Sequence, residues 1–214
     1  MLLDVLRWVA EHQRVLLEAG QRHVELSAAA LGLAVAVAVP LGIALTRVPA
    51  AAPYAIGAAN VLRTIPSLAL LVLMLPLVGT GYLPSMIALT LYGLPAVLLN
   101  TYAGLSSVDP DVVDAARGQG LSDRQIVRRI EVPLALPVVF AGIRTAAVQI
   151  VAAATLAAFV GGGGLGELIT AGMGTLDFPE LVAGALAVAG LAAGTEVLFA
   201  SVERRLAIPR RARA

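Results

Sequence analysis

The sequence predicts an all-α membrane protein that crosses the bilayer about five times, and three observations support this prediction. Of its 214 residues, 59% are hydrophobic and only 14% are charged, an apolar share larger than that of soluble domains. Aromatic residues supply only 4%, so the apolar excess consists mainly of Ala, Leu, Val and Gly, and small residues favour close helix packing in lipid. Five segments approach the roughly 20 apolar residues that a membrane-spanning helix needs.

Residues 1–23 form the first predicted element, an amphipathic helix that precedes the first span. The segment lacks the basic start and uninterrupted apolar stretch of a signal peptide. Its charges alternate in sign at spacings of three and four, which places them along one helix face. The balanced signs favour a solvated helix over one that binds lipid headgroups. The charged residues are Asp4, Arg7, Glu11, Arg14, Glu18 and Arg22.

Residues 24–201 are predicted to form one transmembrane domain. Short breaks rich in proline or glycine interrupt it at 46–49, 79–81 and 161–178, and the single sizeable polar loop covers 106–132. The predicted spans cover residues 24–46, 54–78, 83–105, 134–160 and 179–201.

The positions of the arginines orient these spans. Four arginines lie in the loop 106–132 and five in the basic tail 202–214, whereas 79–83 and 161–178 contain none. Cytoplasmic loops carry an excess of basic residues. We therefore expect the loop and the C-terminal tail to be cytoplasmic and the N-terminus to lie outside.

The loop 106–132 is predicted to fold as two short helices joined by a glycine turn. Asp109 is the predicted N-cap of the first helix, which ends before Gly120. Ser122 and Gln125 have the spacing of a capping box, and the helix that they open is expected to end before Pro133. Small alanine side chains in the first helix would let another protein approach its backbone closely.

This loop resembles the EAA loop of ABC importer permeases. That pattern is Glu-Ala-Ala, three residues, Gly, nine residues, then Ile-x-Leu-Pro, and the spacing matches throughout, with Asp in place of Glu and Val in place of Leu. In that family the loop forms a coupling helix that docks on a cytoplasmic ATPase subunit. The resemblance therefore implies an ATPase-coupling role for Asp114, Ala115, Ala116, Gly120, Ile130 and Pro133.

Further blocks at 40–43, 65–69, 100–109, 142–146 and 154–166 resemble, in order and spacing, the permeases of glycine betaine, carnitine and choline osmoprotectant importers. This resemblance implies the type I ABC importer permease fold and a multi-pass location in a prokaryotic inner (plasma) membrane. It also implies transport of a compatible solute by two permease copies, identical or paralogous. The remaining partners implied are cytoplasmic ATPases that bind ATP and Mg²⁺ and a separate extracytoplasmic solute-binding protein.

Polar residues inside the spans are candidates for the solute pathway or its gate. Arg144 lies about ten residues into the fourth span, so we expect it to face a polar interior or to pair with an acid. Arg63 and Glu196 are expected to snorkel or pair locally near the cytoplasmic side. The polar candidate residues could equally well form hydrogen bonds between helices. The candidate pathway residues are Asn100, Thr101, Arg144, Gln149 and Thr155.

Several other classes of function are disfavoured. The absence of Cys excludes thiol nucleophiles and Cys-ligated zinc, and His12 and His23 are the only histidines, so no catalytic residue, metal site or cofactor site is expected in this chain. A net charge of +1 and a helix-turn-helix tethered between two spans argue against nucleic-acid binding. The glycine run 161–166 lacks the Lys-Ser or Lys-Thr of a phosphate-binding loop.

Two alternatives remain open at this stage. One is a sister ABC permease for methionine or another small solute. The other is a channel or secondary transporter that works without ATP. The coupling-like loop argues against the second, as does the lack of the multiple buried acids expected of a proton-coupled carrier.

Overall fold

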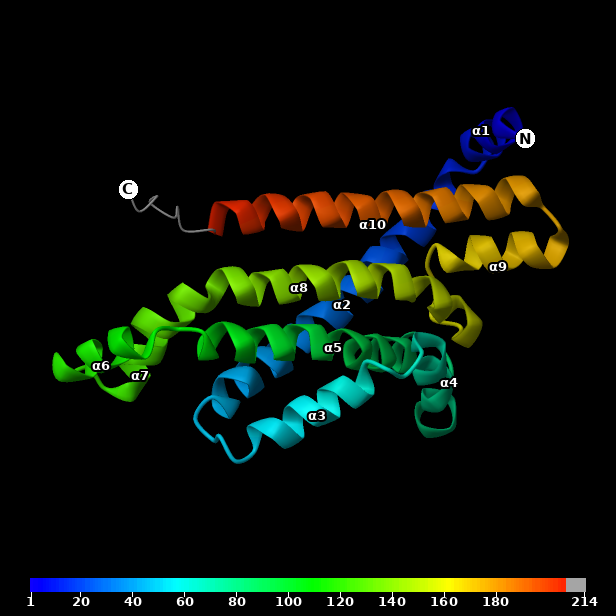
Figure 1. Cartoon of the computed structure of the whole chain (residues 1–214). Helices are drawn as coiled ribbons and strands as arrows, with labels where there is room; N and C mark the ends of the chain where they lie inside the picture. The colour runs from blue at the N-terminus through cyan, green and yellow to red at the C-terminus, as the bar shows by residue number, and fades with distance from the viewer. Residues whose placement is uncertain (207–214) are drawn as a thin grey trace.

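The chain folds into an elongated bundle of helices whose two ends are built differently (Figure 1). The structure, a computed structural model, describes residues 1–206, and that range contains no strand. Arg204 and Arg205 of the predicted basic tail lie at the end of the last helix. Arg210, Arg211 and Arg213 lie outside the described residues.

The predicted all-α membrane fold is confirmed. Three helical runs are each long and apolar enough to cross a membrane, namely α2, α5 and α10, and the run from α7 to η2 is a fourth. Helices α3 and α4 qualify only as a pair bent by 97°, and counting this pair as one span brings the candidate spans within residues 1–206 to five. The elements are α1 (Leu2–Glu11), α2 (Gln13–Leu45), α3 (Ala52–Leu62), α4 (Ser67–Val78), α5 (Tyr82–Ser106), α6 (Pro110–Gly118), α7 (Asp123–Ile126), the π-helical turn η1 (Val127–Glu131), α8 (Val132–Ala154), the 3-10 helix η2 (Thr155–Val160), α9 (Gly166–Thr175) and α10 (Phe178–Leu206).

The N-terminal segment differs from the single helix expected over residues 1–23. Helix α1 ends at Glu11, and α2 begins at Gln13 and continues without a break into the first span. His12 separates them with φ −117° and ψ 28°, and its backbone N–H donates to the Trp8 carbonyl at 2.9 Å. The His12 ring also stacks on Trp8 with centroids 4.6 Å apart. These contacts stabilise a local end of α1 that the charge spacing does not reveal.

The second predicted span, 54–78, is not one straight helix. Pro66 has no N–H to donate, and it disfavours helical backbone at Ile65. Helix α3 therefore ends at Leu62, and α4 begins at Ser67 in a different direction. As a result, Arg63 lies in the bend between two half-helices.

The expectation that the second helix of the loop ends before Pro133 is wrong. Helix α7 passes through the π-helical turn η1 directly into α8, and Pro133 lies in the first turn of α8. In a regular α-helix the proline ring clashes with the carbonyl four residues earlier, and a π-turn places one extra residue in that turn. The loop and the fourth span are therefore mechanically continuous.

Helix α5 lies at the centre of the bundle and packs most extensively against α2 and α8. Glycines allow the close approach of α5 and α8. A methyl carbon added at Gly93 would lie 2.5 Å from Cδ1 of Ile150, and one added at Gly104 would lie 3.1 Å from Cβ of Val138. The small residues that dominate the composition thus form the tightest helix contact.

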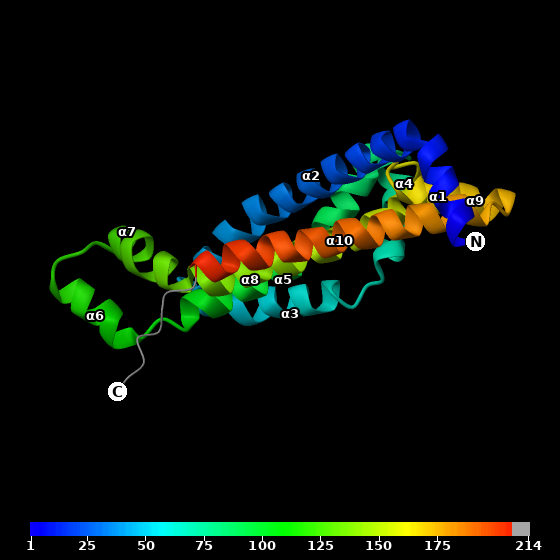
Figure 2. The ribbon, with the colours of Figure 1, turned by 90° about the horizontal axis from the view of Figure 1, so that it is seen from above.

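The two ends of the bundle carry different elements. Helices α6 and α7 project beyond the ends of α5 and α8, and the last described turns of α10 lie toward that same end (Figures 1 and 2). Helices α1, α4 and α9 lie at the opposite end. Of the two segments without arginine, 79–83 joins α4 to α5, and 161–178, expected from the sequence to be a loop, contains α9.

Candidate functional site

The first candidate site is the helical hairpin formed by α6 and α7, residues 110–126. The predicted N-cap, capping box and glycine turn are all present. Asp109 Oδ1 accepts a hydrogen bond from the Asp111 backbone N–H at 3.0 Å, and Gln125 Oε1 accepts one from the Ser122 backbone N–H at 2.9 Å. Between the helices, Gly120 adopts φ +84°, a backbone conformation that favours glycine. The local sequence therefore sets both ends of the turn.

One ion pair joins the helices of the hairpin, from Arg117 Nη2 of α6 to Asp123 Oδ1 of α7 at 3.5 Å. Arg117 also pairs with Asp114 within α6 (Nη1 to Oδ1, 3.1 Å). Such exposed pairs each contribute about 1 kcal/mol or less. Apolar burial is the larger contribution, since Ala116 and Ile126 are almost fully buried.

The burial of Ala116 corrects one expectation. Ala115 and Ala116 were both expected to present a small surface to a partner, but consecutive helical residues point about 100° apart, and Ala116 faces inward. The coupling candidates Asp114, Ala115, Gly120 and Pro133 are exposed, and Ile130 is half-buried. The surface open to a partner thus includes one side of α6, the glycine turn and the start of α7.

An ion pair at the base of the hairpin was missed by sequence reasoning. Arg47, in the connection after α2, pairs with Glu131 of η1, whose side chain is only 9% exposed. The pair links the hairpin to the connection between the first two spans. One signal was available: Glu131 occupies the variable position inside the matched Ile-x-Leu-Pro pattern, where an acid next to the membrane needs a partner.

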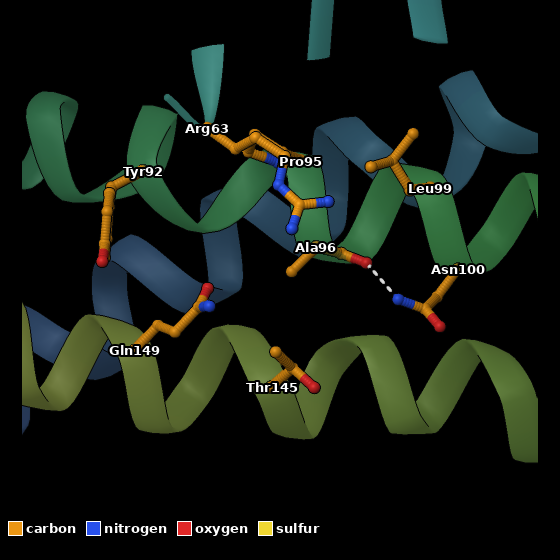
Figure 3. Close-up of a pocket in the computed structure, with 8 residues that line it drawn as sticks. All are labelled: Arg63, Tyr92, Pro95, Ala96, Leu99, Asn100, Thr145 and Gln149. Atoms are coloured by element: carbon orange, nitrogen blue, oxygen red, sulfur yellow. Dashed lines mark hydrogen bonds between the residues drawn. The ribbon is translucent and has the colours of Figure 1, made fainter. Parts of the chain in front are cut away.

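The second candidate site is a polar cavity of about 320 Å³ between α5, α8 and the bend after α3 (Figure 3). We refer to it as the Arg63 cavity. It contains two of the predicted pathway residues, Asn100 and Gln149, and three polar residues that were not predicted to line the pathway, Arg63, Tyr92 and Thr145. The full lining is Arg63, Tyr92, Pro95, Ala96, Leu99, Asn100, Thr145 and Gln149.

The polar groups of this cavity converge from three elements. The guanidinium of Arg63 extends into the space between α5 and α8, toward the side where Gln149 and Thr145 project from α8 (Figure 3). Asn100 donates from Nδ2 to the Ala96 carbonyl at 2.9 Å. Within residues 1–206, Arg63 has no ion pair. Arg63 lies in the bend of a candidate membrane span, and an arginine at the bilayer centre costs roughly 2.5–3.5 kcal/mol on insertion scales, so it is a functional-site candidate by default.

The other three pathway candidates lie outside this cavity. Thr101 is only 1% exposed and packs toward α2, where a methyl carbon added at Gly42 would lie 2.7 Å from its Cγ2. Thr155 begins η2, and its buried Oγ1 has no hydrogen-bond partner in the described part of the chain. Thr101 lies on α5 next to Asn100 but faces another side of the helix, whereas Thr155 lies beyond the end of α8, which carries Gln149.

Arg144 faces α10. Its Nε donates to Glu196 Oε2 at 3.1 Å, a second nitrogen contacts the same carboxylate, and Nη1 donates to Glu203 Oε2 at 2.6 Å. Of the two expectations for Arg144, pairing with an acid is the one that the structure displays. The cluster connects α8 to α10, so Arg144 stabilises the packing of these two helices.

Replacing Arg144 with leucine is expected to lower the melting temperature of the purified permease in detergent. The change leaves the carboxylates of Glu196 and Glu203 close together without a counter-charge, which weakens the attachment of α10 to α8. The variant that also carries Glu196→Gln and Glu203→Gln is the matched control and is expected to recover most of the lost thermal stability. Equal melting temperatures for Arg144→Leu and the unmodified chain would contradict this role.

Taken together, the four or five candidate membrane spans within residues 1–206, an exposed helical hairpin at one end and a polar cavity between the helices are typical of a membrane transport subunit. Residues 38–208 match the family described as the binding-protein-dependent transport system inner membrane component, and the chain belongs to this family. The predicted resemblance to ABC importer permeases is thereby confirmed.

Similar proteins include three bacterial permeases. The choline transport system permease protein OpuBB of Bacillus subtilis (strain 168) is 41% identical over 86% of this chain and 85% of its own length. The carnitine transport permease protein OpuCB of Listeria monocytogenes is 42% identical over 86% and 85%. The osmoprotectant import permease protein OsmW of Salmonella typhimurium (strain LT2) is 40% identical over 89% and 91%.

The fold also matches a solved transporter. A chain of the MetNI methionine ABC transporter, in an inward-facing conformation, superposes with a TM-score of 0.79 over 92% of this chain and 98% of that chain. Its sequence identity is 20%, so the match concerns the fold.

Proposed function

We propose that this permease subunit carries quaternary-ammonium compatible solutes, such as glycine betaine, carnitine or choline, into the cell. The observation that carries the proposal is the exposed hairpin 110–126 on a chain of the binding-protein-dependent transport family. The solute class is supported by relatives at about 40% identity whose names refer to choline, carnitine and osmoprotectants. Membership in this family disfavours a channel that works alone.

In this proposal the hairpin docks on a cytoplasmic ATPase subunit, which binds ATP and Mg²⁺. Two permease copies, identical or paralogous, enclose the pathway, and a separate extracytoplasmic protein delivers the solute. The hairpin and the end of α10 face the cytoplasm, and α1 faces outside. Support for this orientation comes from the arginine distribution and from the location of these elements at opposite ends of the bundle.

Two structural links can transmit motion of the ATPase to the spans. The hairpin continues through η1 into α8, and Arg47 paired with Glu131 fastens its base to the connection between α2 and α3. ATP-driven closure of the ATPases would move both hairpins and favour the outward-open arrangement. The switch operates because ATP binds the two arrangements with different affinity.

The test is uptake of radiolabelled solutes by vesicles that contain this chain, its ATPase and its binding protein. We expect ATP-dependent accumulation of glycine betaine, carnitine or choline, and none with a hydrolysis-deficient ATPase. Accumulation of methionine instead of these solutes would select the sister importer. Uptake that continues without ATP would contradict the proposed function.

A further inference from the structure

The Arg63 cavity has the chemistry of a solute site. It lies along the middle of α5 and α8, and its polar side chains come from segments that are far apart in the sequence. Its volume of about 320 Å³ is at the lower end of the roughly 300–1,000 Å³ that small-molecule sites occupy. Its polar groups are few and convergent, as in binding sites that orient a small ligand.

The charge in this cavity distinguishes between kinds of solute. Arg47 and Arg144 each pair with an acid, Glu131 and Glu196 respectively, whereas Arg63 lines the cavity and has no ion pair within residues 1–206. A guanidinium binds a carboxylate through two parallel hydrogen bonds. The same positive charge repels a solute that carries only an ammonium group. The cavity therefore favours solutes in which a carboxylate accompanies the cation.

The aromatic ring of Tyr92 lines the same cavity and supplies the complementary group (Figure 3). The face of a tyrosine ring attracts quaternary ammonium groups. Asn100, Thr145 and Gln149 add neutral hydrogen-bonding groups to the wall. One ring and one arginine make a weaker site than an aromatic cage, which suits a pathway that must release its solute.

We propose that the Arg63 cavity is a transient binding site for zwitterionic quaternary ammonium solutes, in which Arg63 pairs with the carboxylate and Tyr92 contacts the trimethylammonium group. The proposal rests on the proposed function. It adds a selectivity step inside the permease, where zwitterions such as glycine betaine and carnitine bind better than the cation choline.

The first experiment measures binding by the permease itself, embedded in nanodiscs without its binding protein or ATPase. Saturation-transfer NMR on the methyl protons of glycine betaine should detect binding to the unmodified chain, and choline should bind about tenfold more weakly, because it lacks the charge-assisted bonds to Arg63. Arg63→Gln should abolish this preference, and Arg63→Lys should retain part of it. Absence of glycine betaine binding by the unmodified chain would overturn the inference, whatever the uptake assay gives.

The second experiment measures uptake in the complete transporter with the same variants. Arg63→Gln should lower glycine betaine uptake about tenfold relative to choline uptake. Arg14→Gln, on the exposed start of α2, removes an arginine elsewhere and should leave the ratio unchanged. Tyr92→Phe should take up both solutes as the unmodified chain does, whereas Tyr92→Leu should lower the uptake of both. An unchanged ratio in Arg63→Gln would overturn the site while leaving the proposed transport function intact.

Discussion

Replacing Gly142 with leucine should leave little correctly folded permease in the membrane. A methyl carbon at this position would lie 2.5 Å from Cβ of Asn100 and 2.7 Å from the Ala96 carbonyl oxygen. Because one of these neighbours is backbone, α5 and α8 would have to separate, and we expect a cost at the upper end of the about 1–3 kcal/mol that is typical of overpacking. The separation would also widen the Arg63 cavity, since Ala96 and Asn100 line it. Fluorescence-detected size-exclusion chromatography of the solubilised protein measures the folded fraction.

Gly32→Leu is the matched control, because it adds the same side chain to an exposed position of α2 where no heavy atom lies within 4 Å of an added Cβ. We expect this control to elute and melt as the unmodified chain does. A Gly142→Leu protein with the same folded fraction as Gly32→Leu would mean that α5 and α8 do not meet at Gly142.

Replacing Gly120 should uncouple the permease from its ATPase without removing it from the membrane. An added Cβ at Gly120 meets no atom of this chain, so the fold does not oppose a side chain sterically. The backbone conformation at Gly120 does oppose a side chain, because φ is +84° and a left-handed conformation costs a non-glycine residue roughly 1–2 kcal/mol. Gly120→Ala should therefore shift the hairpin turn and reduce uptake, and Gly120→Trp should reduce uptake further because its ring also obstructs the docking surface.

Co-purification of the ATPase with the permease measures this docking directly. Gly118→Ala serves as the control, since Gly118 also has open space around it but has ordinary helical backbone, where alanine is favoured. This control should keep both ATPase binding and uptake. Normal ATPase recovery and uptake with Gly120→Trp would remove the hairpin from the coupling role.

Sequence reasoning was most successful where structure depends on neighbouring residues. The N-cap at Asp109, the capping box at Ser122 and the turn at Gly120 all follow from bonds that span two or three positions. The same reasoning failed at Pro66 and Pro133. The predicted second span ran straight through Pro66, whereas the chain bends there by 97°. The second hairpin helix was predicted to end before Pro133, whereas it continues past this proline through a π-helical turn.

The candidate site was only partly predictable for a related reason. Asn100 and Thr101 are adjacent in the sequence, yet the first lines the Arg63 cavity and the second packs against α2. Sequence identifies polar residues that are costly in lipid but does not specify the rotation of each helix about its axis. In so alanine-rich a chain, many faces are nearly equivalent in hydrophobicity, so the hydrophobic pattern does not single out the face that lines a cavity.

The lengths of the apolar segments and the loop motif were sufficient by themselves to predict an all-α membrane permease with a helical hairpin between two spans, because each of these depends on local composition or spacing. Tertiary structure alone decided that Arg144 fastens α8 to α10 and that Arg63 enters the cavity between α5 and α8. The physical reason is that both outcomes depend on contacts between residues distant in the sequence. The packing of α10 against α8 brings Glu196 and Glu203 to Arg144, whereas the bend before Pro66 and the close approach of α5 and α8 bring Arg63 to its cavity.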